Sequence, residues 1–268
     1  LANWCKEKNI HFIVDEIYAL SVFPEECMSD ANSKSKNPTS FTSIVSVLDN
    51  KLGDNVHVLY GISKDFGASG LRMGFMYTQN TKLRKAVATI NDAFQVSRLM
   101  QLVLADILKD KLFMTNFFRN NAALVYNSFS VLNSCLTSLN VEIVGPAVGT
   151  TFVFADFRSF INAWKRNKDT TPVITNTNEC NNTDSKYHIS KAEDDLFYKE
   201  VLCDKLKLFF TPSEPCAVLQ RNQLVVGDKE VIKLESVYGY YRICYTWVSL
   251  EGIKECCRRL TEEYVSYS

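Results

Sequence analysis

Residues 61–74 read GISKDFGASGLRMG, with four glycines, two serines, one lysine and one arginine. The apolar run before this stretch, Val56 to Tyr60, is typical of a β-strand, and Leu71 to Tyr77 predicts a further strand. A lysine among glycines and serines is usually part of a solvated loop. The stretch alone therefore leaves the role of Lys64 open, and the rest of the chain has to decide it.

A second polar pair follows a strand earlier in the chain. Ile10 to Val14 is a short β-branched run, typical of a strand buried in a parallel sheet, and Asp15 and Glu16 come directly after it. Ligands of open α/β sheets bind beyond the carboxyl ends of the strands. Since Lys64 also follows a strand, we expect Asp15 and Lys64 at the same edge of one sheet.

The composition favours a small ligand over a macromolecular one. The 268 residues are 46% hydrophobic, enough for one large core or two smaller ones. Thirty basic and thirty acidic residues give no net charge, so the chain lacks the long-range electrostatic field that attracts nucleic acid or an anionic membrane. No apolar segment is long enough to cross a bilayer. Nine cysteines without a framework spacing and three scattered histidines predict a reducing, cytoplasmic compartment and no metal site.

Two domains, 1–125 and 126–268, are expected because the periodicity changes after the third of three helical patterns. Helical patterns cover residues 81–94, 97–113 and 115–139, and an alternating pattern at 141–157 then predicts a smaller α+β domain. Polar composition predicts inserts at about 165–194 and 215–237. Residues 240–247 predict a strand, and 249–265 a closing helix with Ser249 as its N-cap. Because residues 1–10 read as the end of a helix leading into a strand, we expect the C-terminal part of a longer protein.

Four side chains near the predicted sheet edge have the groups that a pyridoxal phosphate site requires. Lys64 offers a primary amine, Asp15 a carboxylate for a protonated pyridine nitrogen, Tyr18 a phenol, and Arg72 a planar fork for a phosphate. Simpler interpretations exist for each residue alone. The acidic pair at 15–16 could cap a helix, and Tyr18 could be a core tyrosine with a satisfied hydroxyl.

The motifs DEIYALSVF at 15–23 and SKDFGASGLRMG at 63–74 together resemble those of one enzyme family. The chain is similar to the fold-type I pyridoxal phosphate enzymes of aminotransferase class I/II, and most like the 1-aminocyclopropane-1-carboxylate synthase-like branch. The resemblance implies an α/β fold. Residues 1–125 would be part of the large, pyridoxal phosphate-binding domain, which has a mostly parallel sheet with helices. The N-terminal part of that domain would be missing. Residues 126–268 would form the small C-terminal α+β domain.

The resemblance also implies roles for individual residues. Lys64 would form a Schiff base with pyridoxal 5'-phosphate and act as the catalytic lysine. Asp15 would face the pyridine nitrogen, Tyr18 the 3-oxygen, and Arg72 the phosphate with help from Ser63. One departure lies three residues before the lysine, where many relatives have a second serine and this chain has a glycine.

A late motif, GYYRICYTW at 239–247, is similar to the family strand whose arginine binds the substrate carboxylate, which implies that role for Arg242. A surface ion pair is the simpler alternative for this arginine. We therefore expect a transferase or lyase acting on α-amino acids, as a homodimer in the full-length protein. The alternative is a non-catalytic relative, or a partial chain, that keeps the fold and the dimer surface without turnover.

Overall fold

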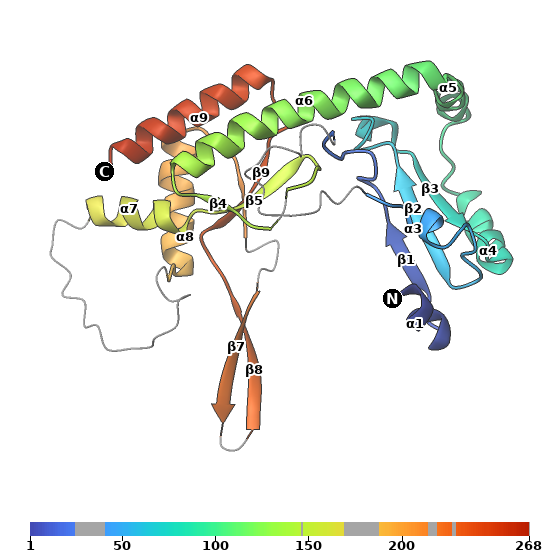
Figure 1. The fold of residues 1–268 in the computed structure, drawn as a ribbon, viewed down its shortest axis with the longest axis horizontal. Coiled ribbons are helices and arrows are strands. Elements are labelled where there is room, and N and C mark those ends of the chain that lie inside the picture. The colour runs from blue at the N-terminus through green and yellow to red at the C-terminus, as the bar shows by residue number, and fades with distance from the viewer. Residues whose placement is uncertain (25–40, 146, 169–187, 214–218, 227–228, 268) are drawn as a thin grey trace. The chain divides into compact units, whose positions relative to one another are not determined.

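The computed structural model describes residues 1–24, 41–145, 147–168, 188–213, 219–226 and 229–267. The chain forms two compact units (Figure 1). The first comprises Leu1–Tyr126 with Val148–Thr150, and the second comprises Asn127–Ala147 with Thr151–Ser268. The long helix α6, Lys111–Ser138, contributes residues to both units.

The first unit contains a three-stranded sheet in the order β1-β2-β3. The strands are β1 (Phe12–Asp15), β2 (Val56–Gly61) and β3 (Gly74–Thr78). Strand β1 runs parallel to β2, with Asp15 opposite Leu59, and β3 runs antiparallel to β2, with Gly61 opposite Gly74. The carboxyl ends of β1 and β2 therefore meet the amino end of β3 at one edge of the sheet.

Helices support this sheet through two apolar clusters. Leu52, Val56 and Val58 are buried with Ala2 of α1 (Ala2–Glu7), and Ile44 of α3 (Ile44–Val47) packs against them. The second cluster joins two residues near the ends of the 61–74 stretch, Ile62 and Met73, to Leu104 of α5 (Arg98–Lys109). The helix α4 (Thr81–Asn91) follows β3 and begins at Asn80, whose side chain accepts a hydrogen bond from the Leu83 amide.

The second unit contains a four-stranded antiparallel sheet in the order β4-β5-β9-β6. Its strands are β4 (Glu142–Ile143), β5 (Phe152–Asp156), β6 (Thr211–Pro212) and β9 (Tyr240–Cys244). A separate antiparallel pair is formed by β7 (Leu219–Val226) and β8 (Lys229–Ser236). The helices are α7 (Arg158–Lys168), α8 (Lys191–Phe197), which continues as the π-helical stretch η3 (Tyr198–Lys205), and α9 (Leu250–Val265).

Aromatic side chains fill the core of the second unit. Phe157, Phe160, Phe197 and Tyr241 are fully buried, and the Phe157 and Tyr241 rings meet edge to face with centroids 5.4 Å apart. The Tyr241 hydroxyl donates a hydrogen bond to the buried carboxylate of Asp194. Burial and this carboxylate raise the pKa of Tyr241 far above its ordinary value, so the phenol stays protonated.

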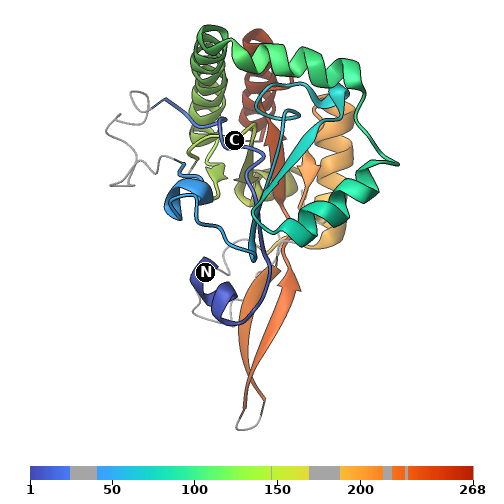
Figure 2. The ribbon, with the colours of Figure 1, turned by 90° about the vertical axis from the view of Figure 1, so that its right-hand side faces the viewer.

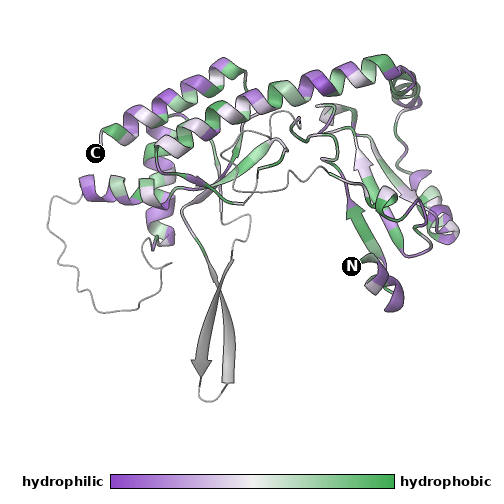
Figure 3. Ribbon diagram, in the orientation of Figure 1, coloured by the Kyte–Doolittle hydropathy of each residue, from purple (hydrophilic) through white to green (hydrophobic). Residues whose placement is uncertain are grey.

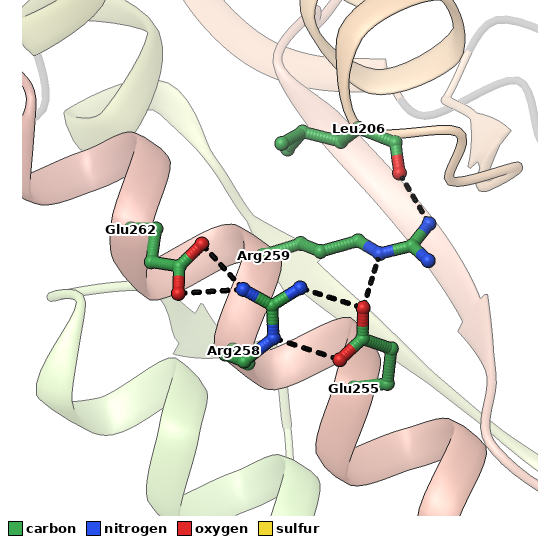
Figure 4. A network of polar contacts seen from close by, with 5 residues as sticks. All are labelled: Leu206, Glu255, Arg258, Arg259 and Glu262. Atoms are coloured by element: carbon green, nitrogen blue, oxygen red, sulfur yellow. Dashed lines mark hydrogen bonds and ion pairs between the residues drawn. The ribbon is translucent and has the colours of Figure 1, made fainter.

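The closing helix α9 is amphipathic, with hydrophilic and hydrophobic bands alternating along it in Figure 3. Ser249 caps its start as predicted, because its hydroxyl accepts a hydrogen bond from the Gly252 amide. A network of ion pairs and hydrogen bonds joins successive turns of α9 and extends to Leu206 (Figure 4). Arg258 joins Glu255 and Glu262, with its nitrogens 2.6–2.8 Å from their oxygens, and Arg259 joins Glu255 to the carbonyl of Leu206.

Several predicted bounds were wrong. The third strand begins at Gly74 instead of Leu71, because residues 69–71 form a 3-10 turn and Arg72 adopts a left-handed conformation, which a strand cannot contain. The insert predicted at 165–194 is shorter at both ends. Helix α7 extends to Lys168, with the buried Trp164 on its apolar face, and Ser190 begins α8 with a capping box.

The insert predicted at 215–237 contains the strand pair β7 and β8, which sequence reasoning missed. The apolar residues at 207–211 also predict a strand, but only Thr211–Pro212 form one there, as β6. The polar residues at 28–42 predict a loop, and they lie largely outside the described residues.

Candidate functional site

The described structure brings five of the six predicted site residues to one edge of the first unit's sheet. Asp15 is the last residue of β1 and is exposed, and one of its carboxylate oxygens accepts a hydrogen bond from the Ile17 amide at 3.1 Å. This short turn leads to Tyr18. The ammonium nitrogen of Lys64 lies 5.8 Å from the centroid of the Tyr18 ring, so the lysine and the phenol share the space beyond the strand ends.

Lys64 follows β2 on a tight turn. The Lys64 carbonyl accepts a hydrogen bond from the Gly67 amide at 3.0 Å, and the Ile62 carbonyl accepts one from Ala68 at 3.2 Å. Gly67 has a positive φ of 61°, which a side chain would strain. Immediately after the lysine, the turn directs the chain away from β2. Lys64 is exposed and Ser63 is half-buried.

Arg72 reaches the same edge because β3 runs antiparallel to β2 and starts two residues later, at Gly74. The residue is exposed and left-handed, with φ 52° and ψ 42°. Its guanidinium donates a hydrogen bond to the Ser69 carbonyl at 3.1 Å. Non-glycine residues are uncommon in this conformation and mark turns or functional constraints.

A buried carboxylate that sequence reasoning did not assign to the site links the two motifs. Asp65 is 1% exposed and accepts three hydrogen bonds. They come from the Leu20 amide at 2.9 Å, the Ser21 hydroxyl at 2.5 Å and the Tyr60 hydroxyl at 2.9 Å. Two of these donors lie in the 15–23 motif, so Asp65 holds that segment against the turn that carries Lys64.

The same network sets the protonation state of the Tyr60 hydroxyl. Burial, the charge of Asp65 and the hydrogen bond to it raise the pKa of Tyr60 far above its ordinary value. Tyr60 therefore remains a hydrogen-bond donor to Asp65 at neutral pH. The signal in the sequence was the position of Asp65 next to Lys64, but the donors from the first motif are 44 and 45 residues away.

Glu16 contacts the start of the helix α3, although the N-cap of that helix is Ser43 and not a residue of the acidic pair. Its side chain is buried, and its carboxylate accepts a hydrogen bond at 2.8 Å from the amide of Ile44, the first residue of α3. The Glu16 amide in turn donates to the Leu59 carbonyl, which extends the β1–β2 pairing by one bond. Of the two acidic residues, Asp15 alone is left exposed at the sheet edge.

Gly61, the departure from the family pattern, is tightly surrounded. A Cβ at this position would lie 3.0 Å from Cδ1 of Ile17 and 3.2 Å from the Met73 carbonyl oxygen. Both contacts are closer than ordinary van der Waals packing. Ile17 and the β3 backbone thus occupy the room that a serine side chain would need.

Arg242 belongs to the second unit and lies on the exposed face of β9. Its guanidinium carbon is 5.3 Å from the centroid of the Phe152 ring, and it donates a long hydrogen bond of 3.4 Å to the Thr211 hydroxyl. Within the described ranges it forms no ion pair, so the simpler interpretation of this arginine as a surface ion-pair partner is not supported.

Two of the three histidines lie in or near the first sheet. His57, the second residue of β2, is buried; one of its ring nitrogens is 2.7 Å from the Thr78 hydroxyl, and burial lowers its pKa. His11, which we expected inside a strand, precedes β1 and is exposed. Among the residues that the structure describes, no three potential metal ligands form a group, and no helix is both long and apolar enough to cross a membrane.

The model of the family described as aminotransferase class I and II matches residues 1–260. The chain belongs to this family. Over 266 residues it is 27% identical to 1-aminocyclopropane-1-carboxylate synthase 8 of Arabidopsis thaliana, an alignment that covers 97% of this chain and 45% of that protein. Over 160 residues it is 28% identical to the "probable inactive 1-aminocyclopropane-1-carboxylate synthase-like protein 2" of Mus musculus, covering 59% of this chain and 25% of that one. The chain thus spans less than half the length of either relative.

Solved structures agree with the family at the level of the fold. An aminotransferase from Mycobacterium tuberculosis superposes with a TM-score of 0.65 at 18% identity, covering 99% of this chain and 51% of that one. The predicted α/β class, as part of the fold-type I aminotransferase fold, is confirmed. The chain corresponds to about half of a complete aminotransferase subunit of this kind.

Proposed function

We propose that the protein carrying this chain is a pyridoxal phosphate-dependent transferase or lyase that acts on α-amino acids, with Lys64 as its covalent lysine. The observation that carries the proposal is the position of the Lys64 amine, 5.8 Å from the Tyr18 ring at the edge where Asp15 ends β1. The first unit would be part of the cofactor-binding domain and the second the small domain. A homodimer is expected from the family.

The residues at this edge fit the cofactor by their chemistry. Asp15 has an exposed carboxylate able to pair with a protonated pyridine nitrogen, and Tyr18 a phenol for the 3-oxygen. Ser63 and the exposed Arg72 would bind the phosphate. Gly61 has no second hydroxyl to offer the phosphate, and a side chain there would meet Ile17 and the Met73 carbonyl closely. When bound, pyridoxal phosphate supplies an aldehyde that condenses with amines and a ring that accepts electrons from the substrate α-carbon.

The chain's own groups would then bind the substrate and move a proton. Lys64 is exposed, so its amine could take the α-proton of the amino acid as a general base and return it. The negative charge of Asp15 would favour the protonated form of the pyridine nitrogen. Arg242 would bind the substrate carboxylate through two parallel hydrogen bonds, since its present bond to Thr211 is long and readily exchanged.

A non-catalytic role is the second candidate, and one observation favours it. The Mus musculus relative is described as probably inactive although its similarity to this chain is comparable to that of the Arabidopsis thaliana synthase. Such a protein would keep the fold and bind its partner subunit without turnover.

An absorbance titration of the purified protein tests the proposal. Added pyridoxal phosphate should give a visible band that Lys64→Ala abolishes and that Lys82→Ala, which changes an exposed lysine of α4, retains. Adding α-amino acids should shift the band of the wild-type protein. A Lys64-dependent band that no amino acid alters would favour the non-catalytic role, and equal bands in the two variants would refute the assignment of Lys64.

A further inference from the structure

Three partly buried cysteines gather where two helices of the second unit meet. Cys135 lies near the end of α6, and Cys256 and Cys257 are consecutive residues of α9. The C-terminal part of α6 and α9 lie side by side in both ribbon views (Figures 1 and 2). All three cysteines are free thiols. The site proposed above uses none of them.

The sulfur atoms of Cys135 and Cys257 each lie close to the backbone of the opposite helix. The sulfur of Cys135 is 3.7 Å from the main-chain carbonyl of Cys257. The sulfur of Cys257 is 4.0 Å from the carbonyl of Val131, one helical turn before Cys135. Each thiol therefore lies against the backbone of the opposite helix beside the other cysteine. Disulfide formation needs this kind of close approach of the two backbones.

The two thiols also differ in acidity in a complementary way. Hydrogen bonding from Cys257, assisted by Thr261, lowers the pKa of Cys135 although burial opposes the shift. The same hydrogen bond and burial raise the pKa of Cys257. Burial raises the pKa of Cys256 to about 12. Cys135 is thus the thiol of this group that ionises first, and Cys257 is the proton-bearing neighbour in contact with it.

We propose that Cys135 and Cys257 form a reversible disulfide when a hydroperoxide oxidises the protein, with Cys135 as the attacking thiol and Cys257 as the resolving thiol. Disulfides of proteins in reducing compartments are typically transient and redox-sensing. The pair links α6 to α9, two helices of the second unit that are far apart in sequence. Oxidation would therefore cross-link this unit and raise its melting temperature.

The reaction balances with hydrogen peroxide as the oxidant. The Cys135 thiolate attacks one peroxide oxygen, the S–O bond forms as the O–O bond breaks, and the leaving hydroxide takes a proton to become water. The Cys257 sulfur then attacks the sulfenic acid sulfur, the S–S bond forms as the S–O bond breaks, and hydroxide leaves with the Cys257 proton as a second water. Two thiols are oxidised by two electrons in total, and one peroxide is reduced to two waters.

Peptide mass spectrometry of the purified protein after hydrogen peroxide treatment tests the proposal. We expect a peptide pair linked through Cys135 and Cys257, which a dithiol reductant separates. The variant Cys257→Ser should trap a sulfenic acid on Cys135 that reacts with dimedone, and Cys203→Ser, a control in η3, should still form the link. A linkage through Cys256, or no linkage at all, would overturn the proposal.

Alkylation of the unmodified protein provides a test that does not depend on the variants folding. At neutral pH, iodoacetamide should modify Cys135 about tenfold faster than Cys256 or more, because the thiolate is the reacting species. Equal rates at the two positions would overturn the assignment of Cys135 as the attacking thiol.

Discussion

Replacing Asp65 by alanine should loosen the contact between the two sequence motifs of the site. The carboxylate is 1% exposed and accepts hydrogen bonds from Leu20, Ser21 and Tyr60. A hydrogen bond to a charged group contributes about 1.5 to 3 kcal/mol. Because the Ser21 and Tyr60 hydroxyls can turn toward other partners, the loss should fall below the sum of three such bonds. We expect Asp65→Ala to lower the free energy of unfolding by about 3 to 5 kcal/mol.

Urea unfolding measures this loss, and Asp106→Ala is the matched control. Asp106 is in the same unit, is 78% exposed and pairs only with Lys109 at 3.0 Å among the described residues, so its removal should cost less than about 1 kcal/mol. The milder Asp65→Asn should lower the pKa of Tyr60 toward its ordinary value, read from tyrosinate absorbance, since the carboxylate charge that opposes ionisation is lost. The reasoning fails if Asp65→Ala is no more destabilising than the control and the Tyr60 titration is unchanged.

Three further changes have defined outcomes. Gly61→Ser should cost about 1 to 3 kcal/mol of stability through overpacking against Ile17, whereas Gly70→Ser, with no atom within 4 Å of its Cβ, should be nearly neutral; equal effects would contradict the packing argument. Hydrogen bonds from Arg258 and Arg259 lower the pKa of Glu255 from its ordinary 4.5 to about 2. The stabilisation by the Glu255 carboxylate is therefore present above pH 4.5 and lost as the pH falls through 2. Thermal melts of wild type and Glu255→Gln should differ at pH 6, and the difference should shrink as the pH falls from 4.5 to below 2; a constant difference would refute this. Arg242→Ala should weaken α-amino acid binding by about 2 to 5 kcal/mol in a spectral titration while leaving cofactor affinity intact, and unchanged substrate affinity would count against its role.

The sheet edge was predictable because its signals are local. Two β-branched runs end directly before Asp15 and before the 61–74 stretch, and the parallel pairing of β1 with β2 puts these ends together. The role of Asp65 was not predictable in this way. Its donors lie more than 40 residues earlier in the chain, and their contact with Asp65 exists only after β1 and β2 have paired.

The errors at the two predicted inserts have a common cause, which is that polar composition was taken as a sign of irregular structure. Helix α7 continues through a run of basic residues because only one face, including Trp164, has to be apolar. The pair β7 and β8 had a signal that composition obscured. Two apolar, β-branched runs are separated in sequence by Gly227 and Asp228, a spacing that predicts a hairpin.

The central claim is that Lys64 is the covalent lysine of a pyridoxal phosphate site, and borohydride reduction tests it most directly. The purified protein is incubated with pyridoxal phosphate, reduced, digested and mapped by mass spectrometry, with Lys64→Ala and Lys82→Ala treated in parallel. The account predicts one stoichiometric phosphopyridoxyl group, on the peptide containing Lys64, in the wild type and in Lys82→Ala, and none in Lys64→Ala. A stoichiometric adduct on another lysine, or the same labelling after Lys64 has been replaced, would contradict it.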